Sequence, residues 1–336
     1  MPVVKSARIF AWSLFAGMLL LGSAAADTAP FAIVEPRDMS LVDGTFISIS
    51  LKLSDPAIDS VTISGGNKND EAVVQVAKGS GVVCKTYPLR INRNELTVTA
   101  LKDGNQLASQ KVTVFNFSDI SKQYKTSPPE FAPAMFHTKE REAVCAGCHA
   151  LNAGEKDLRP GKSSNSMCYA CHRKITEFKY IHGPAAKWEC LACHEKDSSP
   201  VKYEVRKTER ELCFACHDEE RAKWAEKEYM HGPTATGKCS ICHNPHASAN
   251  RYWLKLPPAQ LCASCHEDMG TGKKRHNLRL FNLIGDHPIK GFRDPRDLKE
   301  RLTCTSCHTP HASFFPMMLA FEGKSIFAFC NQCHMK

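Results

Sequence analysis

Between residues 31 and 117, apolar and polar side chains alternate along the chain. In FISISLKLS, which begins at Phe46, isoleucines and leucines alternate with serines and a lysine. The stretches VTIS, AVVQV, GVVCKTYPL, ELTVTALK and QKVTVFNF continue the pattern, and the turn-forming segments SDP, SGGNKND, KGSG and KDGNQ separate them. Successive side chains of a strand point to opposite faces, so this alternation allows one face to be buried. The pattern predicts a small antiparallel β-sandwich over residues 27–117.

The stretch NELTVTALKDGNQLASQKVTV, residues 94–114, resembles the last hairpin of bacterial immunoglobulin-like modules. The resemblance implies an immunoglobulin-like sandwich that acts as a docking or spacing module, or only as a stabilising domain. Cys84 is the one cysteine of this region. We expect it to be a buried thiol on a strand, with a reactive or intermolecular cysteine as the alternative. Residues 118–134, SDISKQYKTSPPEFAPA, are polar and then proline-rich, which predicts a linker.

The first residues have the pattern of a secretory leader. Lys5 and Arg8 precede the apolar run IFAWSLFAGMLLLG, and small residues follow as far as Ala26. This order predicts a signal peptide over residues 1–26, cleaved before Asp27. A membrane anchor is the alternative, but a span needs roughly 20 apolar residues. We therefore expect a periplasmic protein without a membrane span of its own, with outer-membrane association or an extracellular location as alternatives.

Beyond the predicted linker the alternation ends, and residues 135–336 repeat the motif C-x-x-C-H eight times. Exported proteins often contain disulfides, but disulfides do not require a histidine after every second cysteine. Covalent attachment of haem c does require it. Cysteines three positions apart lie on one face of a helical turn and can reach both vinyl groups of one porphyrin. One such motif could also belong to a zinc site or a redox dithiol, whereas eight in one chain favour eight haems c.

The candidate attachment residues are the two cysteines of each motif, and the candidate proximal iron ligand is its histidine. The cysteines are Cys145, Cys148, Cys168, Cys171, Cys190, Cys193, Cys213, Cys216, Cys239, Cys242, Cys262, Cys265, Cys304, Cys307, Cys330 and Cys333. The histidines are His149, His172, His194, His217, His243, His266, His308 and His334.

Seven histidines lie outside the motifs, and six of them occupy a repeated position. Three lie eight residues before the first cysteine of a motif, and one precedes a motif with a longer spacer. Two more lie three residues after a motif histidine, beyond a proline that ends the helical turn and lets the side chain point at a neighbouring haem. The candidate distal ligands are His137, His182, His231, His287, His246 and His311. His276, in the basic run KKRHNLR, is either a ligand or a solvated basic residue.

Eight irons need eight distal ligands, so at least one haem lacks a second histidine from this chain. The alternatives are a methionine, a lysine or amine, an open iron, or a histidine from a partner. The candidate methionines are Met269, Met317 and Met318. Asn152 and Asp197 stand where His246 and His311 stand in their own units, which places the unusual haem toward the N-terminal part of this region.

The spacing also predicts how the second part is built. When each motif is named by its first cysteine, the motifs are expected to pair as 168/190, 213/239 and 262/304, with single motifs at 145 and 330. So little protein surrounds each haem that the haems themselves must form the core, with irregular chain and short helices around them. In ITEFKYIHG, Ile175, Phe178 and His182 are expected on one face of a helix.

The formal net charge of +9 would fit a nucleic-acid ligand, but the haem propionates change this. Without Lys5 and Arg8, eight haems would bring the charge to about −1 oxidised and about −9 reduced. We therefore expect no nucleic-acid partner.

The phrases LCxxCH and CHNPH resemble those of doubled C-x-x-C-H multihaem cytochromes c, particularly the periplasmic haem chains of outer-membrane electron conduits. The resemblance covers residues 137–336. It implies an electron relay through mostly bis-histidine haems of low potential, without substrate chemistry. The implied partners are small periplasmic cytochromes or a quinol-oxidising complex as donors, and an outer-membrane conduit or extracellular acceptor. Two alternatives stay open: an oxyanion reductase with one open haem, and a subunit of a cytochrome filament or other homo-oligomer.

Overall fold

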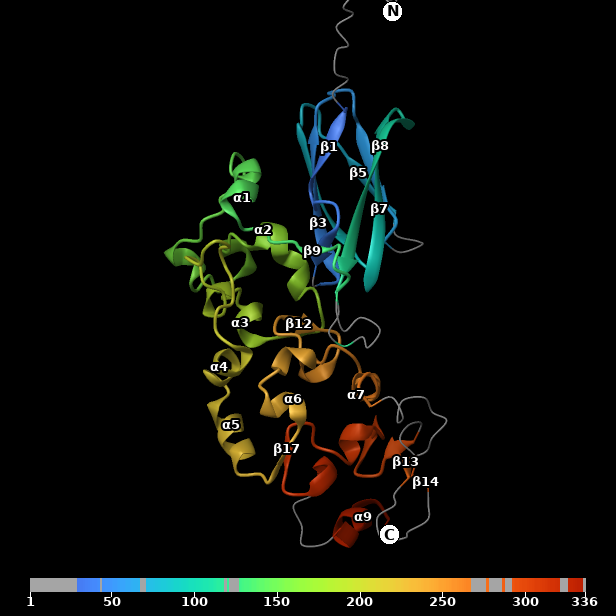
Figure 1. Ribbon diagram of the computed structural model, residues 1–336, viewed down its shortest axis with the longest axis vertical. Helices are drawn as coiled ribbons and strands as arrows, with labels where there is room; N and C mark the ends of the chain where they lie inside the picture. Colours follow the sequence, from blue (N-terminus) through green and yellow to red (C-terminus); the bar gives the residue numbers. More distant parts are fainter. Residues whose placement is uncertain are drawn as a thin grey trace, which may run out of the picture.

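The computed structural model describes residues 29–42, 44–66, 71–117, 120, 127–266, 276–277, 286–287, 292–320 and 326–334. The predicted signal peptide lies outside these residues. The molecule is elongated: a β-rich region lies at one end, and the C-terminal region extends from it along the long axis (Figure 1).

The described part of the β-rich region contains nine strands in two sheets. They are β1 (Phe31–Glu35), β2 (Ser40–Val42), β3 (Phe46–Leu53), β4 (Ser60–Ser64), β5 (Ala72–Gln75), β6 (Val82–Pro88), β7 (Asn92–Lys102), β8 (Asn105–Asn116) and β9 (Ala132–Pro133). The strand orders are β1-β3-β6 and β5-β4-β7-β8-β2-β9. The six stretches with an alternating pattern form β3 to β8, as predicted. The sheets are not wholly antiparallel, since β2 pairs in parallel with both β8 and β9. β1, β2 and β9 were not predicted from the sequence, and β9 lies in the predicted linker.

The alternation positions the core of this region as expected. Ile49 and Leu51 of β3 are fully buried, while Ser48 and Lys52 are exposed. The hydrophobic core cluster lies wholly between Phe31 and Val114. The longest hairpin, β7 to β8, turns at Asp103 and Gly104, whose φ values of 49° and 77° match the turn that suits twisted strands.

The prediction that Cys84 is buried is wrong. It lies on β6 next to the buried Val83, so its side chain points to the opposite, exposed face of the strand. Its Sγ lies 3.9 Å from the hydroxyl of Ser50 on β3.

The C-terminal region consists of short helices, short strand pairs and irregular chain, as expected. Its helices are α1 (Lys139–Cys145), α2 (Tyr169–His172), α3 (Gly183–Ala186), α4 (Glu209–Phe214), α5 (Asp218–Ala225), α6 (Gly232–Ala235), α7 (Pro258–Ala263) and α9 (Ile326–His334). Its 3-10 helices are Glu155–Asp157, Ser163–Asn165, Arg173–Thr176, Cys190–Ala192, Cys239–Ile241, Arg251–Trp253, Cys304–Ser306 and Pro316–Met318. Its strands are β10 (Tyr180–Ile181), β11 (Tyr229–Met230), β12 (Ala247–Ser248), β13 (His276–Asn277), β14 (Asp286–His287), β15 (Arg293–Asp294), β16 (Asp297–Arg301) and β17 (Ala312–Ser313).

The helix expected across ITEFKYIHG is not formed. A 3-10 helix ends at Thr176, β10 follows, and His182 has an extended backbone with ψ of 143° before α3 begins. Pro184 stands at the start of α3, where its fixed φ suits a first helical turn but its ring excludes a preceding one. The Gly-Pro pair therefore starts a new helix after His182.

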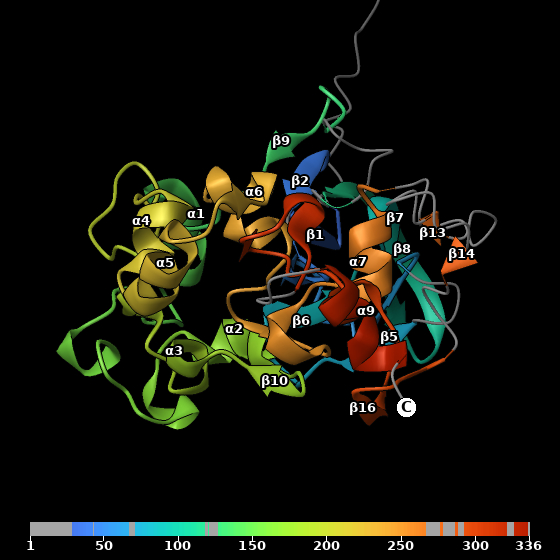
Figure 2. The same cartoon turned by 90° about the horizontal axis from the view of Figure 1, so that it is seen from below.

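The C-terminal region has few buried apolar side chains. Among the described residues beyond 134 they are Trp188, Ala247, Leu302, Ala312 and Leu319. In the described part of the chain, no helix has the length and apolar character needed to cross a membrane. Seen along the long axis, α4 and α5 lie to one side and α9 and β16 to the other (Figure 2), so the successive segments shift sideways as they descend.

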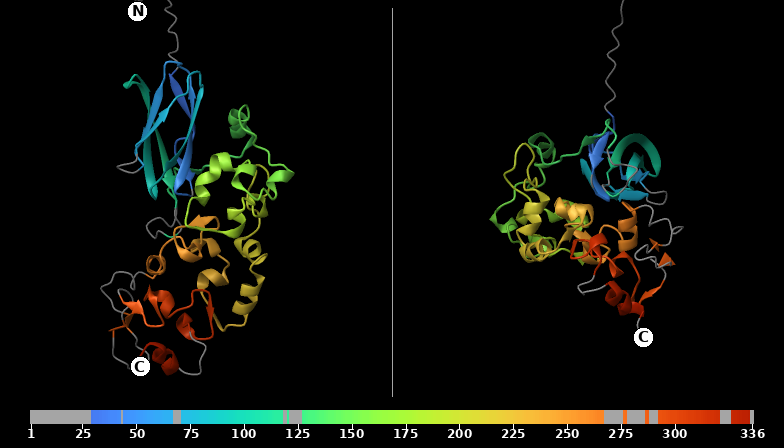
Figure 3. Two further views of the ribbon diagram at one scale, coloured as in Figure 1. Left: turned by 180° about the vertical axis from the view of Figure 1, so that it is seen from behind. Right: turned by 60° about the horizontal axis from the view of Figure 1, so that its bottom comes forward.

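The two regions meet through a nearly buried ion pair and an aromatic contact. Nε of Arg141 in α1 lies 3.3 Å from Oε1 of Glu35 in β1, and the two side chains are 11% and 12% exposed. Burial raises the pKa of Glu35, and the nearby Arg141 opposes this shift. The rings of Phe46 and Phe178 are 6.4 Å apart. The sandwich therefore rests beside α1 and α2, at the beginning of the C-terminal region (Figure 3).

Because its core is self-contained, the β-rich region should fold as a fragment of residues 29–134. Leu96→Ala on β7 removes a fully buried side chain and should lower the fragment's free energy of unfolding by about 2–5 kcal/mol in urea denaturation followed by circular dichroism. Leu107→Ala on β8, where the side chain is 40% exposed, is the control and should change it by less than about 1 kcal/mol. Equal losses in the two variants would contradict this core.

Candidate functional site: paired histidines

The C-terminal region is built from four segments of one design. Each begins with a non-motif histidine, contains two C-x-x-C-H motifs and ends at the second motif histidine. We name them repeat 1 (residues 137–172), repeat 2 (182–217), repeat 3 (231–266) and repeat 4 (287–334). In the first three, the two terminal histidines are separated by 35 positions.

Within each of the first three repeats, the first and last histidines face each other. The ring centroids of His182 and His217 are 6.3 Å apart and their planes differ by 20°. In repeat 3 the ring centroids of His231 and His266 are 6.2 Å apart and their planes differ by 25°. In repeat 1 the values for His137 and His172 are 6.1 Å and 32°. The histidine that opens a repeat therefore lies opposite the second motif histidine of the same repeat.

The first motif histidine of a repeat instead faces a histidine from the next repeat. His194 of repeat 2 lies 6.1 Å from His246 of repeat 3, with planes only 6° apart. His243 of repeat 3 lies 5.9 Å from His311 of repeat 4, with planes 15° apart. The predicted role of CHNPH and CHTPH, reaching toward a neighbouring motif, therefore has a matching geometry.

The separation of the rings fits one metal ion between two imidazoles. Metal–nitrogen bonds of about 2 Å, plus about 1 Å from each nitrogen to its ring centre, place the centroids about 6 Å apart. Ordinary aromatic pairs span about 4.5–7 Å, so a single distance would decide nothing. Here all five pairs join one motif histidine to one non-motif histidine at nearly the same separation. Among the described residues, no three His, Cys, Asp or Glu side chains form a compact metal cluster. Two axial imidazoles around a porphyrin are the donor set that this arrangement fits.

Backbone carbonyls orient these imidazoles. Nδ1 of His194 lies 2.7 Å from the carbonyl oxygen of Tyr203, nine residues later. His243 and Tyr252 repeat this contact at 2.7 Å, and so do His308 and Met317. When Nδ1 carries the proton and donates it to a carbonyl, Nε2 is left free to bind a metal.

The segments NPH and TPH hold the adjacent repeat as well as supplying a histidine. The N–H of His182 donates to the carbonyl of His246 at 2.9 Å, and β10 pairs with β12 just beyond. The carbonyl of Pro245 also accepts a hydrogen bond from the His182 ring. In the next copy, the carbonyl of His311 accepts from the N–H of His231 at 3.0 Å, and β11 pairs with β17.

Burial keeps these rings neutral. It lowers the pKa of His246 and of His311 to about 4, and the neighbouring His194 and His243 act in the same direction. Burial likewise lowers the pKa of His172, His182 and His231. A neutral imidazole is the form that binds a metal.

His137 is held by a carboxylate instead of a carbonyl. Its Nδ1 lies 2.9 Å from Oε1 of Glu142, and Lys202 donates to the other oxygen of Glu142 at 2.5 Å. Lys202 also donates to the side-chain oxygen of Asn152 at 2.6 Å. Burial favours the protonated acid, but the hydrogen bonds from Lys202 and His137 hold the pKa of Glu142 below its ordinary value. No sequence pattern pointed to Glu142, because a single acidic residue forms no recognisable motif.

The motif cysteines meet across the boundaries between repeats. Cys168 hydrogen bonds to Cys190, which lowers the pKa of Cys168 to about 6 and raises that of Cys190. The same contact joins two further pairs. These pairs are Cys213 with Cys239, and Cys262 with Cys304. The second cysteines also lie near enough to affect one another electrostatically at successive motifs. These pairs are Cys193 with Cys216, Cys242 with Cys265, and Cys307 with Cys333.

Two predicted histidines and the candidate methionines remain. His276 and His287 lie on the paired strands β13 and β14, where the structure describes the backbone alone. Met269 lies outside the described residues. Met317 is 55% exposed, and its carbonyl is the acceptor for His308.

Comparisons with known proteins support the motif. A family model described as a doubled CXXCH motif matches residues 182–222, 231–271 and 297–336. These motifs indicate a multihaem c-type cytochrome with covalently bound haem c. The match includes six of the eight motifs, and the remaining two, in repeat 1, fall outside it.

Two further comparisons add little. No curated protein matches the chain. Among solved structures, the sulfur carrier protein SoxY from Chlorobium limicola f thiosulfatophilum is 14% identical over 26% of this chain and 76% of that chain, with a TM-score of 0.22. An engineered protein is 16% identical over 26% of this chain and 21% of that chain, with a TM-score of 0.21. Likenesses this low carry no argument about fold or function.

The family match corrects the predicted grouping of motifs along the chain. It joins the motifs that begin at Cys190 and Cys213, at Cys239 and Cys262, and at Cys304 and Cys330. The predicted grouping 168/190, 213/239 and 262/304 is therefore wrong for the units that repeat along the sequence. The predicted pairs do meet in space, because the cysteines in contact belong to the end of one repeat and the start of the next.

The pairing of His246 with His194 yields a specific expectation. His246→Ala should convert one low-spin ferric haem to high spin, because it removes one axial ligand, while leaving haem attachment intact. Electron paramagnetic resonance and the mass of the protein would measure the two effects. Arg251→Ala, which removes a side chain that is 61% exposed, is the control and should change neither. An unchanged low-spin spectrum in His246→Ala would contradict the pairing.

Proposed function

We propose that the chain is an exported octahaem c-type cytochrome that relays electrons along closely packed, mostly bis-histidine haems. One haem is attached at each C-x-x-C-H motif, and the five imidazole pairs supply both axial ligands of five of them. By the same order of histidines within a repeat, His287 would serve the haem at His334. Bis-histidine ligation favours low potentials.

The observation that carries this proposal is the order of the motifs in space. Contacts or electrostatic effects between cysteines link each motif to the next along the chain. They begin with Cys145 and Cys171 and end with Cys307 and Cys333. Each thioether lies at the edge of its porphyrin, so neighbouring cysteines bring porphyrin edges together. In Figure 1 the green segments lie toward the sandwich and the red segments lie at the opposite end of the long axis, with yellow and orange segments between them, which fits an extended array. Short, consecutive steps between haems suit electron transfer better than a reaction at one centre.

The array has two ends at which electrons could enter or leave. One lies beside the sandwich, which we propose to be an immunoglobulin-like docking or spacing module, and the other lies at α9. We propose a periplasmic location, small cytochromes or a quinol-oxidising complex as donors, and an outer-membrane conduit or extracellular acceptor. Contact between partners would be through exposed haem edges at the ends.

Mass and thiol counting test the haem number. The mature protein should carry eight haem masses, and the denatured protein should show one reactive thiol, that of Cys84. Cys84→Ser should show none. Each motif without haem would add two thiols, so any larger count would contradict eight attachments.

The exposed Cys84 allows the relay itself to be tested. This thiol lies close enough to Cys145 and Cys171 to contribute to the raised pKa of both. A photoreductant attached to Cys84 should therefore inject an electron at the first haems. In His311→Ala, the haem at His243 should become high spin and increase the high-spin absorption band relative to the labelled protein that keeps His311. This additional absorption should bleach after the flash as the electron arrives, and the controls are the labelled protein with His311 and the label-free Cys84→Ser protein. Reduction confined to the haems near the label would contradict a relay.

A further inference from the structure

Equivalent positions in successive repeats predict which residue faces each first motif histidine. In repeats 3 and 4, the residue three positions after the first motif histidine is a histidine that faces the preceding repeat. The corresponding position of repeat 2 is residue 197, and its target is His149 of repeat 1. That position is occupied by Asp197.

The loop that carries Asp197 is built like the loops that carry the histidines. His194 makes the same hydrogen bond, at 2.7 Å, to the carbonyl nine residues later as its counterparts do in the next two repeats. The carbonyl belongs to Tyr203, whose φ of 63° matches the 57° of Tyr252 and of Met317. The three loops therefore share this hydrogen bond and this backbone conformation. The loop of repeat 2 differs in carrying an aspartate where the other two carry a histidine.

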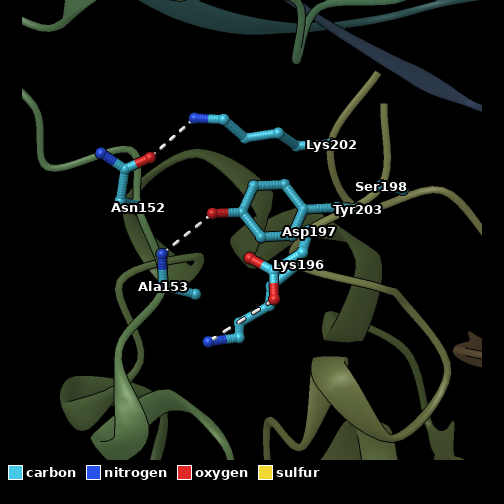
Figure 4. A pocket seen from close by; sticks show the side chains of 7 residues that line it. All are labelled: Asn152, Ala153, Lys196, Asp197, Ser198, Lys202 and Tyr203. Atoms are coloured by element: carbon cyan, nitrogen blue, oxygen red, sulfur yellow. Dashed lines mark hydrogen bonds and ion pairs between the residues drawn. The ribbon is translucent and has the colours of Figure 1, made fainter. Parts of the chain in front are cut away.

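This loop also contacts the segment that follows His149, which is where the equivalent position in the other repeats predicts it to lie. The Tyr203 hydroxyl accepts from the N–H of Ala153 at 2.9 Å and donates to the carbonyl of Leu151 at 2.8 Å. Between the loop and this segment lies a pocket of about 240 Å³, with Asp197 on its wall (Figure 4).

Asp197 is a poor replacement for an imidazole. Its side chain is 86% exposed, and its Oδ2 lies 3.8 Å from Nζ of Lys196. A carboxylate is shorter than an imidazole and harder as a ligand, and the usual axial ligands of haem iron are His, Cys, Met and Tyr.

The other histidines are engaged or distant. His137 faces His172, and the remaining described non-motif rings face motifs of repeats 2 and 3. The strands β13 and β14, which carry His276 and His287, lie at the far end of the molecule from α1, which runs into the motif at Cys145 (Figures 1 and 3). None of the five histidine pairs in the described part of the chain includes His149.

We propose that the haem attached through Cys145 and Cys148 has His149 as its one axial ligand from the protein, and that its other face binds a small inorganic ligand, neutral or anionic. The ligand must donate an electron pair to the iron, so it is neutral or anionic. This inference rests on the proposed haem attachment at this motif and adds a ligand-binding site to the relay.

The test compares the purified full-length protein with Asp197→His and Asp197→Asn. Electron paramagnetic resonance of the ferric protein counts high-spin haems, and a cyanide titration followed by absorption counts the haems that bind an exogenous ligand. Asp197→His should lower both counts by one, because it restores the imidazole of the register. Asp197→Asn should leave both unchanged. Since Asp197 is exposed, neither variant should disturb folding.

Three results would overturn the proposal. The first is a native protein without a high-spin haem, and the second is an Asp197→His protein with unchanged counts. The third is a high-spin haem that appears only in Cys84→Ser, which would make the thiol of Cys84 the sixth ligand. The mass of the tryptic peptide 142–156 separates these results from failure of the proposed function, because a peptide without haem would mean that this motif carries none.

Discussion

The separation of about 6 Å between paired imidazoles is the constraint on which the C-terminal region depends. This region buries few apolar side chains of its own, so ordinary packing cannot hold its segments together. Each pair instead joins two distant points of the chain, as His182 and His217 do within repeat 2. Helices here need only be long enough to present a motif, as in α2, whose single turn carries Cys171 and His172.

The same short segment fixes both the ligand and the assembly of the repeats. Pro245 offers its carbonyl to the ring of His182, while the next residue, His246, faces His194. β12 then pairs with β10 of the previous repeat. Because one segment performs all three tasks, the spacing between repeats and the pairing of the histidines cannot vary independently. Repetition of this segment fits the linear array of haems that we propose.

The first repeat departs from the others because it borders on the sandwich. Glu142 replaces the proline carbonyl as the partner of His137, and Lys202 joins that carboxylate to Asn152. The adjacent Arg141 pairs with Glu35 of the sandwich. The N-terminal end of the proposed array is thus held by polar contacts of Glu142, Lys202 and Arg141, and at this end Asp197 occupies the position that a histidine has in repeats 3 and 4.

The sequence by itself determined which residues can attach haem, where the chain changes from strands to motifs, and which histidines stand in register, because these depend on local spacing. It also determined the buried face of β3, since alternation is a local property. The tertiary structure alone decided that His246 faces His194 and His182 faces His217, because those partners are brought together by strand pairing between segments distant in the chain. It also decided that Cys84 is exposed and lies beside the first motifs, since burial depends on what covers the outer face of a strand.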